Sequence, residues 1–591
     1  MKRNDFEGLD LGALSSSAVA ALIVLAGLLV LATRLYEVQI TDSSQYGYIN
    51  NRQSVRSVLV GGPRGRILDR HCQPLADNRV ASSIVCCPEA FQKRTWEATV
   101  LEISNGIARV GAAIGRPSAL SMRTIRRHVS QSLALPLTVW RELDDRELAI
   151  FAERAEEFPG FEVEDTFERV YPRGSFAAHL LGYVGRDRGD AVAGDEKYNF
   201  YAPEMRGRAG LESYYDGFLR GVSGERKVLV DARGFAIEEW TVVEPSKGLD
   251  LCLSLDANIQ AAVEAELRGL KGAAAVINPK TGEVLALASA PGFNPNDFVP
   301  VLNSELYDRY AKNPAKPLLN RACGGGYAPG STFKPITALA GLAAGVPPNL
   351  LHDCQGVYEL GQMKIHCAAR WGHGTLDLRH ALMKSCNPYF CNLAMEAGTN
   401  LLVRSARAFG LGQKTGLDFG VDMAGTVPTA EWKMRMYNEK WFLGDVAQMS
   451  IGQGMLLVSP LQMARVAGAI GTGYLVTPHL KRDLPAERRK LPFPEAHLRV
   501  VREGLRMVVN GDGRERGTGW RAGEGLSVTA CGKTGTAEVG RGATRRKNTW
   551  FIAYAPAEDP TVALAMVIEN GDSGGGTAAP KAGAVLRAIF N

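Results

Sequence analysis

A long uncharged apolar stretch near the start of the chain is the strongest hydrophobic pattern in the sequence. From Ala13 to Ala32 no charged side chain interrupts a run rich in alanine, leucine and valine. As a helix this run is long enough, at about 20 residues, to span the hydrocarbon core of a membrane. We therefore predict a retained transmembrane helix over residues 13–33. A cleavable signal peptide is the alternative, but the apolar run is long for one and lacks a clear small-residue cleavage site.

The charges on either side of this stretch predict its orientation. Lys2 and Arg3 precede it and Arg34 follows closely, while acidic residues among positions 1–12 partly offset the basic ones. Positive charge favours the cytoplasmic side of a membrane. We predict a cytoplasmic tail over residues 1–12 and a single-pass protein of the cytoplasmic (inner) membrane. The rest of the chain then lies in the periplasm or outside the cell.

The next part of the chain, residues 34–245, is polar, rich in arginine and irregular, with a helical pattern in its middle from about Glu97 to Arg154. Its Arg, Asp and Glu side chains are expected to form hydrogen bonds and salt bridges rather than to take part in catalysis.

From residue 246 to residue 591 the pattern changes to that of an α+β domain. Alternation of apolar and polar residues predicts a strand over 249–256, and an amphipathic helix follows over 259–270. Further segments complete the domain: a β-hairpin over 273–278 and 283–289, a strand-like stretch over 526–532, strands over 549–556 and 561–569, and a closing helix over 579–590. Strands at both ends with mostly helical sequence between them predict an antiparallel sheet covered by helices.

Composition excludes some classes of function. The chain has 591 residues, of which 46% are hydrophobic, so it can bury a sizeable core in more than one domain. A net charge of +6 is too small and too scattered to indicate nucleic-acid binding. No Gly-rich phosphate loop of the P-loop pattern is present, which argues against an ATP-driven enzyme.

Ser331 and Lys334 form the first motif that indicates chemistry. Pro329 and Gly330 precede them and an apolar run follows, so the pair is expected in the first turn of a buried helix, with the ammonium beside the hydroxyl. A serine hydroxyl becomes a nucleophile when a neighbouring group takes its proton, and a desolvated lysine with a lowered pKa can do so. A serine and a lysine at this spacing also occur by chance, so the pair indicates a catalytic site only when further motifs support it.

Two further motifs follow in the order that this chemistry needs. Ser385-Cys386-Asn387 is the first, and Lys533-Thr534-Gly535-Thr536, placed after the strand-like 526–532 segment, is the second. Together with the first motif they match the set found in penicillin-binding proteins and serine β-lactamases. The chain resembles a class B penicillin-binding protein, a peptidoglycan D,D-transpeptidase, and is most similar to the penicillin-binding protein 2 group that serves cell elongation. The likeness covers nearly the whole sequence.

The resemblance implies a role for each motif residue. Ser331 attacks a D-alanyl peptide and becomes acylated, Lys334 is the base, and Ser385 relays a proton to the leaving amine. Asn387 holds the acyl donor and Lys533 supplies positive charge. Thr534 and Thr536, around Gly535, bind the terminal carboxylate of the substrate. The oxyanion is expected at the backbone N–H groups of Ser331 and Thr536.

The resemblance also implies that residues 34–245 form an elongated pedestal domain of mixed α and β structure that holds the active site away from the membrane. Arg64 to Arg70 looks like the signature that opens this domain, although His71-Cys72 replaces the usual Asn-Gly. The implied partners are peptidoglycan stem peptides and their lipid-linked precursor polymer, β-lactams, the membrane, and a membrane glycan polymerase of the shape, elongation and division family.

Four residues form a candidate structural zinc site: Cys354, Cys367, His373 and Cys386. Three thiols and an imidazole are a common tetrahedral zinc set, and some elongation-type penicillin-binding proteins carry zinc in this region. Cys386 is expected to point away from the cleft if its segment is extended. The alternatives are a Cys354–Cys367 disulfide with Cys386 as a buried hydrophobe, or His352, Asp353 or His366 as substitute ligands. No cofactor is needed for the chemistry itself.

Three other functions stay open at this point: a division-type transpeptidase, a D,D-carboxypeptidase or β-lactamase on the same scaffold, and a β-lactam sensor or scaffolding protein. The membrane anchor and long pedestal argue against the second, and the complete set of motifs argues against the third. Sequences that resemble the elongation group include Trp371-Gly372-His373-Gly374 and Glu431-Trp432-Lys433.

Overall fold

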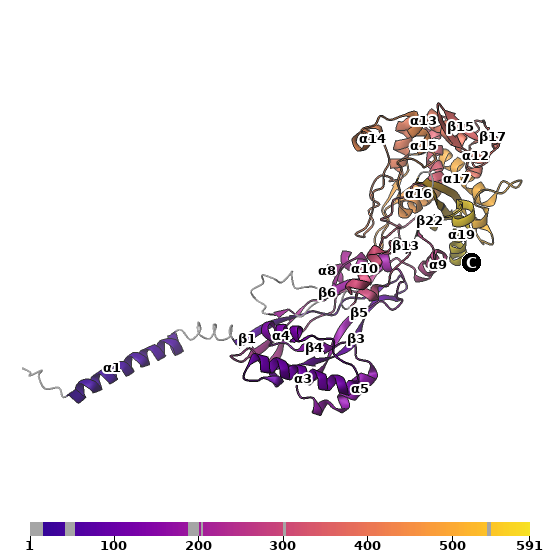
Figure 1. Cartoon of the computed structure of the whole chain (residues 1–591). Coiled ribbons are helices and arrows are strands. Elements are labelled where there is room, and N and C mark those ends of the chain that lie inside the picture. The colour runs from indigo at the N-terminus through magenta and orange to yellow at the C-terminus, as the bar shows by residue number, and fades with distance from the viewer. Residues whose placement is uncertain (1–15, 42–53, 187–199, 202–204, 300–302, 541–544) are drawn as a thin grey trace, which may run out of the picture.

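The chain is elongated, as the computed structural model in Figure 1 shows. Helix α1 (Ser16–Tyr36) lies at the N-terminal end, a first folded domain follows, and a second folded domain at the far end contains the C-terminus. The structure describes residues 16–41, 54–186, 200–201, 205–299, 303–540 and 545–591. The cytoplasmic tail predicted over residues 1–12 lies outside the described residues.

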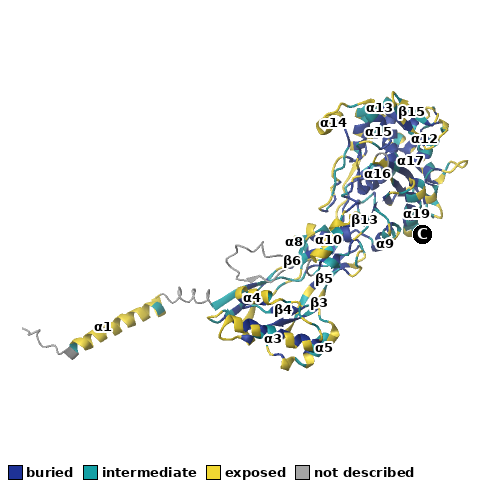
Figure 2. Ribbon diagram, in the orientation of Figure 1, coloured by how far each residue is buried: buried dark blue, intermediate teal, exposed yellow. Residues whose placement is uncertain are grey.

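Helix α1 is exposed over its apolar surface, in contrast to the two folded domains (Figure 2). The segment Ala18–Thr41 includes the π-helical turn η1 (Glu37–Thr41), and its most apolar window of 18 residues has a mean hydropathy of 2.4 with none of its residues buried within the protein. It is the one candidate membrane span in the part of the chain that the structure describes. An apolar helix without a protein neighbour is consistent with a membrane anchor.

The N-terminal domain combines two larger sheets, a two-stranded pair of β6 and β8, and several helices. One sheet has the order β10-β9-β1-β7, and the other has the order β11-β2-β3-β4, with β5 also paired to β3. Its strands are β1 (Val55–Val60), β2 (Ile67–Leu68), β3 (Pro74–Cys86), β4 (Leu137–Trp140), β5 (Phe161–Val170), β6 (Val184–Arg186), β7 (Phe200–Tyr201), β8 (Met205–Gly207), β9 (Gly224–Val230), β10 (Ala236–Val243) and β11 (Leu251–Cys252). Its helices are α3 (Trp96–Ile114), α4 (Met122–Gln131), α5 (Asp145–Glu153), α6 (Ala178–Leu181), α7 (Gly210–Tyr214) and α8 (Asp216–Leu219).

A buried ion-pair network stabilises this domain around Glu212. Arg64 Nε lies 2.7 Å from Glu212 Oε2, and Arg169 Nε lies 2.6 Å from Oε1 of the same carboxylate. Glu212 has no exposed side-chain surface, and Arg64 also pairs with Asp216 at 2.7 Å. The acidic and basic residues of this domain therefore form salt bridges, as predicted. A carboxylate buried to this extent depends on both of its cationic partners.

The C-terminal domain is built on a five-stranded antiparallel sheet with the order β13-β12-β22-β21-β20. The strands are β12 (Gly272–Ile277), β13 (Val284–Ala290), β20 (Cys531–Val539), β21 (Arg546–Ala555) and β22 (Val562–Glu569). Strand β20, from late in the sequence, forms one edge. Short two-stranded pairs join β14 (His352–Cys354) to β17 (Gly374–Leu376), β15 (Val357–Leu360) to β16 (Met363–His366), and β18 (Tyr474–Val476) to β19 (Arg488–Lys490).

Helices cover both faces of the sheet, so its central strands are almost entirely buried. The helices of this domain are α9 (Ala257–Leu267), α10 (Ser304–Lys312), α11 (Lys334–Ala343), α12 (Leu378–Lys384), α13 (Asn387–Ala408), α14 (Ala430–Tyr437), α15 (Leu443–Ser450), α16 (Pro460–Thr472), α17 (Glu495–Asn510), α18 (Trp520–Gly523) and α19 (Ala579–Phe590). One face of the sheet packs with α11, α13, α16 and α17, and the other with α9 and α19. The prediction of an antiparallel sheet covered by helices is confirmed.

Several predicted elements need correction. The strand predicted over 249–256 shortens to β11, which pairs in parallel with β2 and so completes a sheet of the N-terminal domain. The helical segment predicted over Glu97–Arg154 is interrupted by β4, which is held by pairing with β3. The strand predicted over 526–532 begins only at Cys531 and continues to Val539, because the ladder to β21 runs through the whole Lys533–Thr536 motif.

Candidate active site

Ser331 lies on a turn of 3-10 helix, η5 (Gly330–Phe333), that leads directly into α11. The prediction placed it in the first turn of the helix itself. The helical segment is correct, but its first turn is tighter than an α-turn. Ser331 is half-buried, whereas its neighbours Thr332 and Phe333 have no exposed surface. The hydroxyl is therefore the side chain that this turn presents toward solvent.

Lys334 begins α11 and is completely buried. Its Nζ donates to the backbone oxygen of Ser385 at 2.6 Å, to Asn387 Oδ1 at 2.6 Å and, more weakly, to Ser385 Oγ at 3.3 Å. The predicted direct contact with Ser331 Oγ is not among its hydrogen bonds within the described residues. Burial lowers the pKa of Lys334 to about 8, because the charged form loses hydration. A lysine in this state can act as a base near neutral pH.

Ser385 lies at a sharp turn between α12 and α13. Its backbone adopts the left-handed conformation, with φ 59° and ψ 41°, which is unusual for a residue other than glycine. Cys386 then precedes α13 in an extended conformation, and Asn387 is the first residue of that helix. This change of direction presents Ser385 and Asn387 to Lys334 while Cys386 turns into the protein, as predicted.

Lys533 reaches the same serine from a different element of the sheet. It lies on the edge strand β20, is completely buried, and donates to Ser385 Oγ at 2.9 Å and to the backbone oxygen of Thr534 at 3.1 Å. Burial, together with the charge of Lys334, lowers the pKa of Lys533. Ser385 Oγ thus lies between two lysine side chains. Protonating both would place two positive charges close together in a buried site, which is unfavourable. Such an arrangement favours proton transfer through the hydroxyl.

Gly535 allows β20 to lie against the turn that carries Ser331. A Cβ atom at this position would approach the backbone oxygen of Pro329 to 2.9 Å, closer than real Cβ contacts. Glycine therefore lets the strand and the nucleophile turn come together. This contact, with the hydrogen bonds of Lys334 and Lys533 to Ser385, brings the three sequence motifs side by side.

The two threonines of the motif contact residues that the sequence did not single out. Thr534 Oγ1 lies 2.8 Å from Thr518 Oγ1, and Thr536 Oγ1 accepts from Gly574 N at 3.1 Å. Gln453 Nε2 lies 3.5 Å from the backbone oxygen of Thr536. Thr518 and Gln453 belong to loops, Gly574 begins the π-helical turn η7 (Gly574–Ala578), and no motif marked any of the three.

The four predicted metal ligands form one cluster behind Ser385. Their ligand atoms, from Cys354, Cys367, His373 and Cys386, all lie within 4.8 Å of one another. His373 Nδ1 is 3.3 Å from Cys367 Sγ and 3.8 Å from Cys354 Sγ. Ideal tetrahedral zinc geometry places such sulfur and nitrogen atoms roughly 3.5 Å apart and two sulfur atoms about 3.8 Å apart. The donor set and its spacing therefore fit a tetrahedral metal ion.

The alternative disulfide between Cys354 and Cys367 is not formed, and all ten cysteines are free thiols. The substitute ligands also lie outside the cluster. His352 Nε2 contacts Asn392 Nδ2 at 2.9 Å, and the backbone of His366 accepts from Asn387 Nδ2 at 2.7 Å. Cys531, on β20, is buried in the core and packs there as a small hydrophobic residue.

Comparison with known proteins agrees with this geometry. Residues 272–591 match the family model of the penicillin-binding protein transpeptidase domain, and residues 60–253 match that of the penicillin-binding protein dimerisation domain. The chain belongs to the penicillin-binding proteins. It is 31% identical to the peptidoglycan D,D-transpeptidase MrdA of Escherichia coli K12, over 97% of this chain and 93% of that protein.

Solved structures of penicillin-binding proteins share the fold over nearly the whole chain. The penicillin-binding protein 2 of Helicobacter pylori, in its complex with MreC, matches with a TM-score of 0.77 and 26% identity, covering 91% of this chain and 98% of that one. A chain in a peptidoglycan synthase complex matches with a TM-score of 0.72 and 27% identity, covering 98% of both. The predicted function, a serine-type peptidoglycan D,D-transpeptidase of the elongation group, is confirmed, and the alternatives are not favoured.

Proposed function

We propose that this penicillin-binding protein crosslinks peptidoglycan stem peptides through an acyl-enzyme on Ser331, with the motif residues in the roles that their geometry allows. The observation that carries this proposal is the convergence of Lys334 and Lys533 on Ser385 Oγ, beside the turn that presents Ser331. Two buried amines and a bridging hydroxyl supply a path for the proton that must leave the nucleophile and reach the leaving group.

In the first step Ser331 Oγ attacks the carbonyl carbon of the penultimate D-alanine. Lys334, in its neutral form, takes the hydroxyl proton as the new C–O bond forms. The C–N bond to the terminal D-alanine then breaks, and Ser385 passes a proton to the departing amine. Ser385 regains a proton from Lys334, which returns to its neutral form, while Lys533 donates a hydrogen bond to Ser385 Oγ from the other side. The products are an ester on Ser331 and free D-alanine.

Substrate binding uses the edge of β20. We assign Thr534 and Thr536, with the charge of Lys533, to the terminal carboxylate of the donor. The oxyanion lies at the backbone N–H groups of Ser331 and Thr536. The side-chain amide of Asn387 already accepts from Lys334 and donates to the backbone oxygen of His366. Its remaining donor and acceptor sites hold the backbone of the acyl donor.

In the second step an amine of a neighbouring stem peptide attacks the ester. Its nitrogen forms the new amide bond, the Ser331 C–O bond breaks, and the amine proton returns through the same lysine and serine network. No separate group in the sequence marks a base for water, which favours transfer over hydrolysis. A D,D-carboxypeptidase would use the same residues but release the acyl group to water.

We further propose that the Cys354, Cys367, His373 and Cys386 cluster binds one structural zinc ion. Zinc would fix the tetrahedral arrangement of these four side chains and, through Cys386, the backbone between Ser385 and Asn387. The ligand spacing and the burial of the three thiols support this assignment. Elemental analysis of protein purified without chelator should give one zinc per chain. Metal-free protein with Cys354 and Cys367 oxidised together would contradict it.

The membrane orientation and the partners follow the same reasoning. We propose that α1 anchors the chain with its N-terminus in the cytoplasm, so that both folded domains face the periplasm or the cell exterior. The relatives named above include a penicillin-binding protein 2 bound to MreC and a chain from a peptidoglycan synthase complex. By analogy, this chain works beside a membrane glycan polymerase during elongation, using lipid-linked precursor polymer as substrate.

Product analysis tests the proposed reaction. The full chain in detergent, together with a glycan polymerase and lipid-linked precursor, should yield crosslinked muropeptide dimers that disappear when benzylpenicillin is added. Ser331→Ala should give glycan without dimers. Trimmed monomers without dimers would instead identify a carboxypeptidase. Depletion in the host separates elongation from division, because loss of rod shape supports the former and filaments of undivided cells support the latter.

A further inference from the structure

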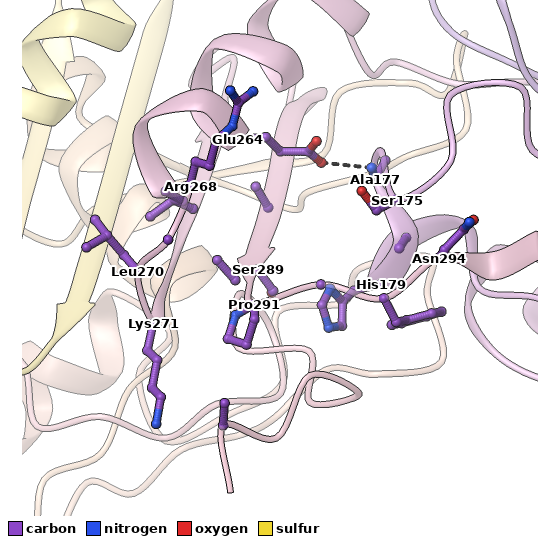
Figure 3. Close-up of a pocket in the computed structure, with 18 of the residues that line it drawn as sticks. Ser175, Ala177, His179, Glu264, Arg268, Leu270, Lys271, Ser289, Pro291 and Asn294 are labelled. Carbon is purple, nitrogen blue, oxygen red and sulfur yellow. Dashed lines mark hydrogen bonds between the residues drawn. The ribbon is translucent and has the colours of Figure 1, made fainter. Parts of the chain in front are cut away.

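Two cavities lie away from the catalytic residues. They differ in whether the buried polar groups that line them already have hydrogen-bond partners. The first, of about 660 Å³, lies where Ser175 to His179 meet α9 and β13 (Figure 3). Its buried polar groups are occupied. Glu264 Oε1 accepts from Ala177 N at 2.7 Å and from Gln260 Nε2 at 2.8 Å, and His179 Nε2 contacts the backbone oxygen of Pro317 at 2.6 Å. This cavity therefore gives no indication of a ligand.

The second cavity, of about 330 Å³, lies on the C-terminal domain between the end of α13, helix α16 and the β18–β19 pair. Its lining includes Gly410, Lys414, Arg465, Thr477, Arg488 and Arg489. None of these residues belongs to the catalytic motifs or to the metal cluster. At roughly 30 Å³ per water molecule, the space holds about ten waters, which is enough for a small anion and part of the molecule that carries it.

Arg465 is the central feature of this cavity, because its guanidinium is buried without an acidic partner. The residue is only 6% exposed, and its Nε donates to the backbone oxygen of Val476 at 2.8 Å. Nη1 and Nη2 make no hydrogen bond or ion pair within the described residues. Burial lowers the pKa of Arg465 to about 10. A buried cation without a carboxylate at ion-pair distance is costly, so its retention needs a reason.

The backbone around Arg465 keeps the ends of the guanidinium accessible from the cavity. Gly410, just after α13, has a φ of +73°, and a Cβ atom there would lie 3.3 Å from Arg465 Nη1. Glycine satisfies the left-handed conformation and also leaves this space open. The two free nitrogens of Arg465 thus form a planar pair of donors beside the open volume, the arrangement that binds two oxygens of one anion.

Three further cations surround the opening. Lys414, Arg488 and Arg489 are exposed, and none of them forms an ion pair with a carboxylate in the described parts of the chain. Arg489 Nη2 donates to the backbone oxygen of Ala408 at 3.0 Å, and the Arg488 guanidinium lies 5.0 Å from the centre of the Tyr474 ring. Both side chains are therefore held beside the cavity.

Acidic groups near the cavity only partly offset this charge. Glu487 is the acidic residue in its lining, and its backbone oxygen accepts from Thr477 N at 2.8 Å. Asp422 attracts Arg465 from beyond ion-pair distance, and its Oδ2 accepts from Gly416 N at 3.0 Å. Even with Asp422, whose Oδ1 has no hydrogen-bond partner, counted beside Glu487, the four cations exceed the two carboxylates, and the cavity attracts anions.

We propose that this cavity is an anion-binding site in which Arg465 binds a compact oxyanion, either a carboxylate of a peptide or a phosphate group. Arg465 supplies the paired hydrogen bonds, and Lys414 and Arg489 supply longer-range attraction. The proposal does not depend on the proposed catalytic roles, because it concerns a separate surface of the domain. Carboxylates of peptide chains and phosphate groups of lipid-linked precursors are the two sources of such an oxyanion.

Calorimetric titration tests the site directly. The full chain in detergent is titrated with sodium acetate or with inorganic phosphate at constant ionic strength set by sodium chloride. The titration is repeated after treatment with benzylpenicillin, so that binding in the catalytic cleft is recognised by its loss. We expect one saturable site that persists in the treated protein. Stronger binding of acetate indicates a peptide carboxylate, and stronger binding of phosphate indicates a phosphate group.

Variants link that binding to the cavity. Arg465→Gln should weaken it by roughly 10- to 100-fold, the equivalent of a charge-assisted hydrogen bond. Arg489→Gln and Lys414→Gln, at exposed positions that tolerate change, should each weaken it to a smaller extent, which keeps the test valid if Arg465→Gln fails to fold. Arg499→Gln makes the same charge change on the exposed face of α17 and should leave binding unaltered. Absence of a saturable site, or equal affinity in all four variants, would overturn the proposal.

Discussion

Removing the amine of Lys334 should slow acylation by a large and pH-dependent factor. Lys334→Gln keeps a hydrogen-bond donor of similar reach toward Ser385 and Asn387 but cannot accept the proton of Ser331. Loss of a general base costs about 10²- to 10⁴-fold in rate. We therefore expect the rate constant for acylation by benzylpenicillin to fall by this factor, while the protein remains folded.

The pKa of Lys334 sets the expected pH profile of the wild-type protein. With a pKa of about 8, roughly one tenth of the chains carry the neutral amine at pH 7 and roughly nine tenths at pH 9. A lysine at the ordinary value of 10.5 would be neutral in only about 3 of 10,000 chains at pH 7. Since the neutral form is the base, acylation should rise about tenfold between pH 7 and pH 9 and then level off.

The assay is stopped-flow acylation with a fluorescent penicillin between pH 6 and pH 10. Lys384→Gln is the matched control, because Lys384 lies next to Ser385 in sequence but pairs with Glu515. That variant should acylate at nearly the wild-type rate with the same pH profile. A flat wild-type profile from pH 7 to pH 9, or a Lys334→Gln rate within a few-fold of wild type, would refute the assignment of Lys334 as the base.

Three further changes test other parts of the account. Cys367→Ser should reduce the zinc content well below one per chain and slow acylation, as measured by elemental analysis and penicillin labelling, because the metal would hold the Ser385 turn. Thr536→Val should lower the second-order rate constant of acylation by about 10-fold, the equivalent of one hydrogen bond to a charged carboxylate. Glu212→Ala should destabilise the pedestal by about 3–5 kcal/mol in chemical denaturation, because it leaves the buried Arg169 without its acidic partner and removes one of the two acidic partners of Arg64. Glu97→Ala, which breaks an exposed pair, should cost less than about 1 kcal/mol.

For each of these predictions, one result would contradict the reasoning. Unchanged zinc content in Cys367→Ser would remove that residue from the metal site. Thr536→Val with a wild-type acylation rate would separate that hydroxyl from carboxylate binding. Equal losses of stability for Glu212→Ala and Glu97→Ala would mean that the buried network contributes no more than a surface pair.

Segments with continuous apolar character were predicted well from the sequence. The hairpin formed by β12 and β13 and the closing helix Ala579–Phe590 appear where the pattern placed them. Their residues are buried against the two main cores, so the apolar pattern and the packing agree. The metal cluster was also predictable, since its ligand types are rare and lie in one stretch of chain.

Elements that depend on distant contacts were predicted less well. Strand β20 carries the polar and glycine-rich Lys533–Thr536 segment, which has little intrinsic tendency to form a strand, and it is held by its ladder to β21. The contacts of Lys334 with Ser385 and Asn387 likewise depend on the packing of α11 against α13. Thr518 and Gln453 enter the site from loops, so no local pattern could mark them.

The central claim is that one hydroxyl, that of Ser331, becomes acylated. Intact-mass measurement of the full chain after brief incubation with benzylpenicillin tests it most directly, with Ser331→Ala treated in parallel. We predict the addition of one penicillin to every active wild-type chain, mapped by peptide analysis to Ser331, and no addition to the variant. No added mass on the wild type, or equal addition to Ser331→Ala, would contradict the account.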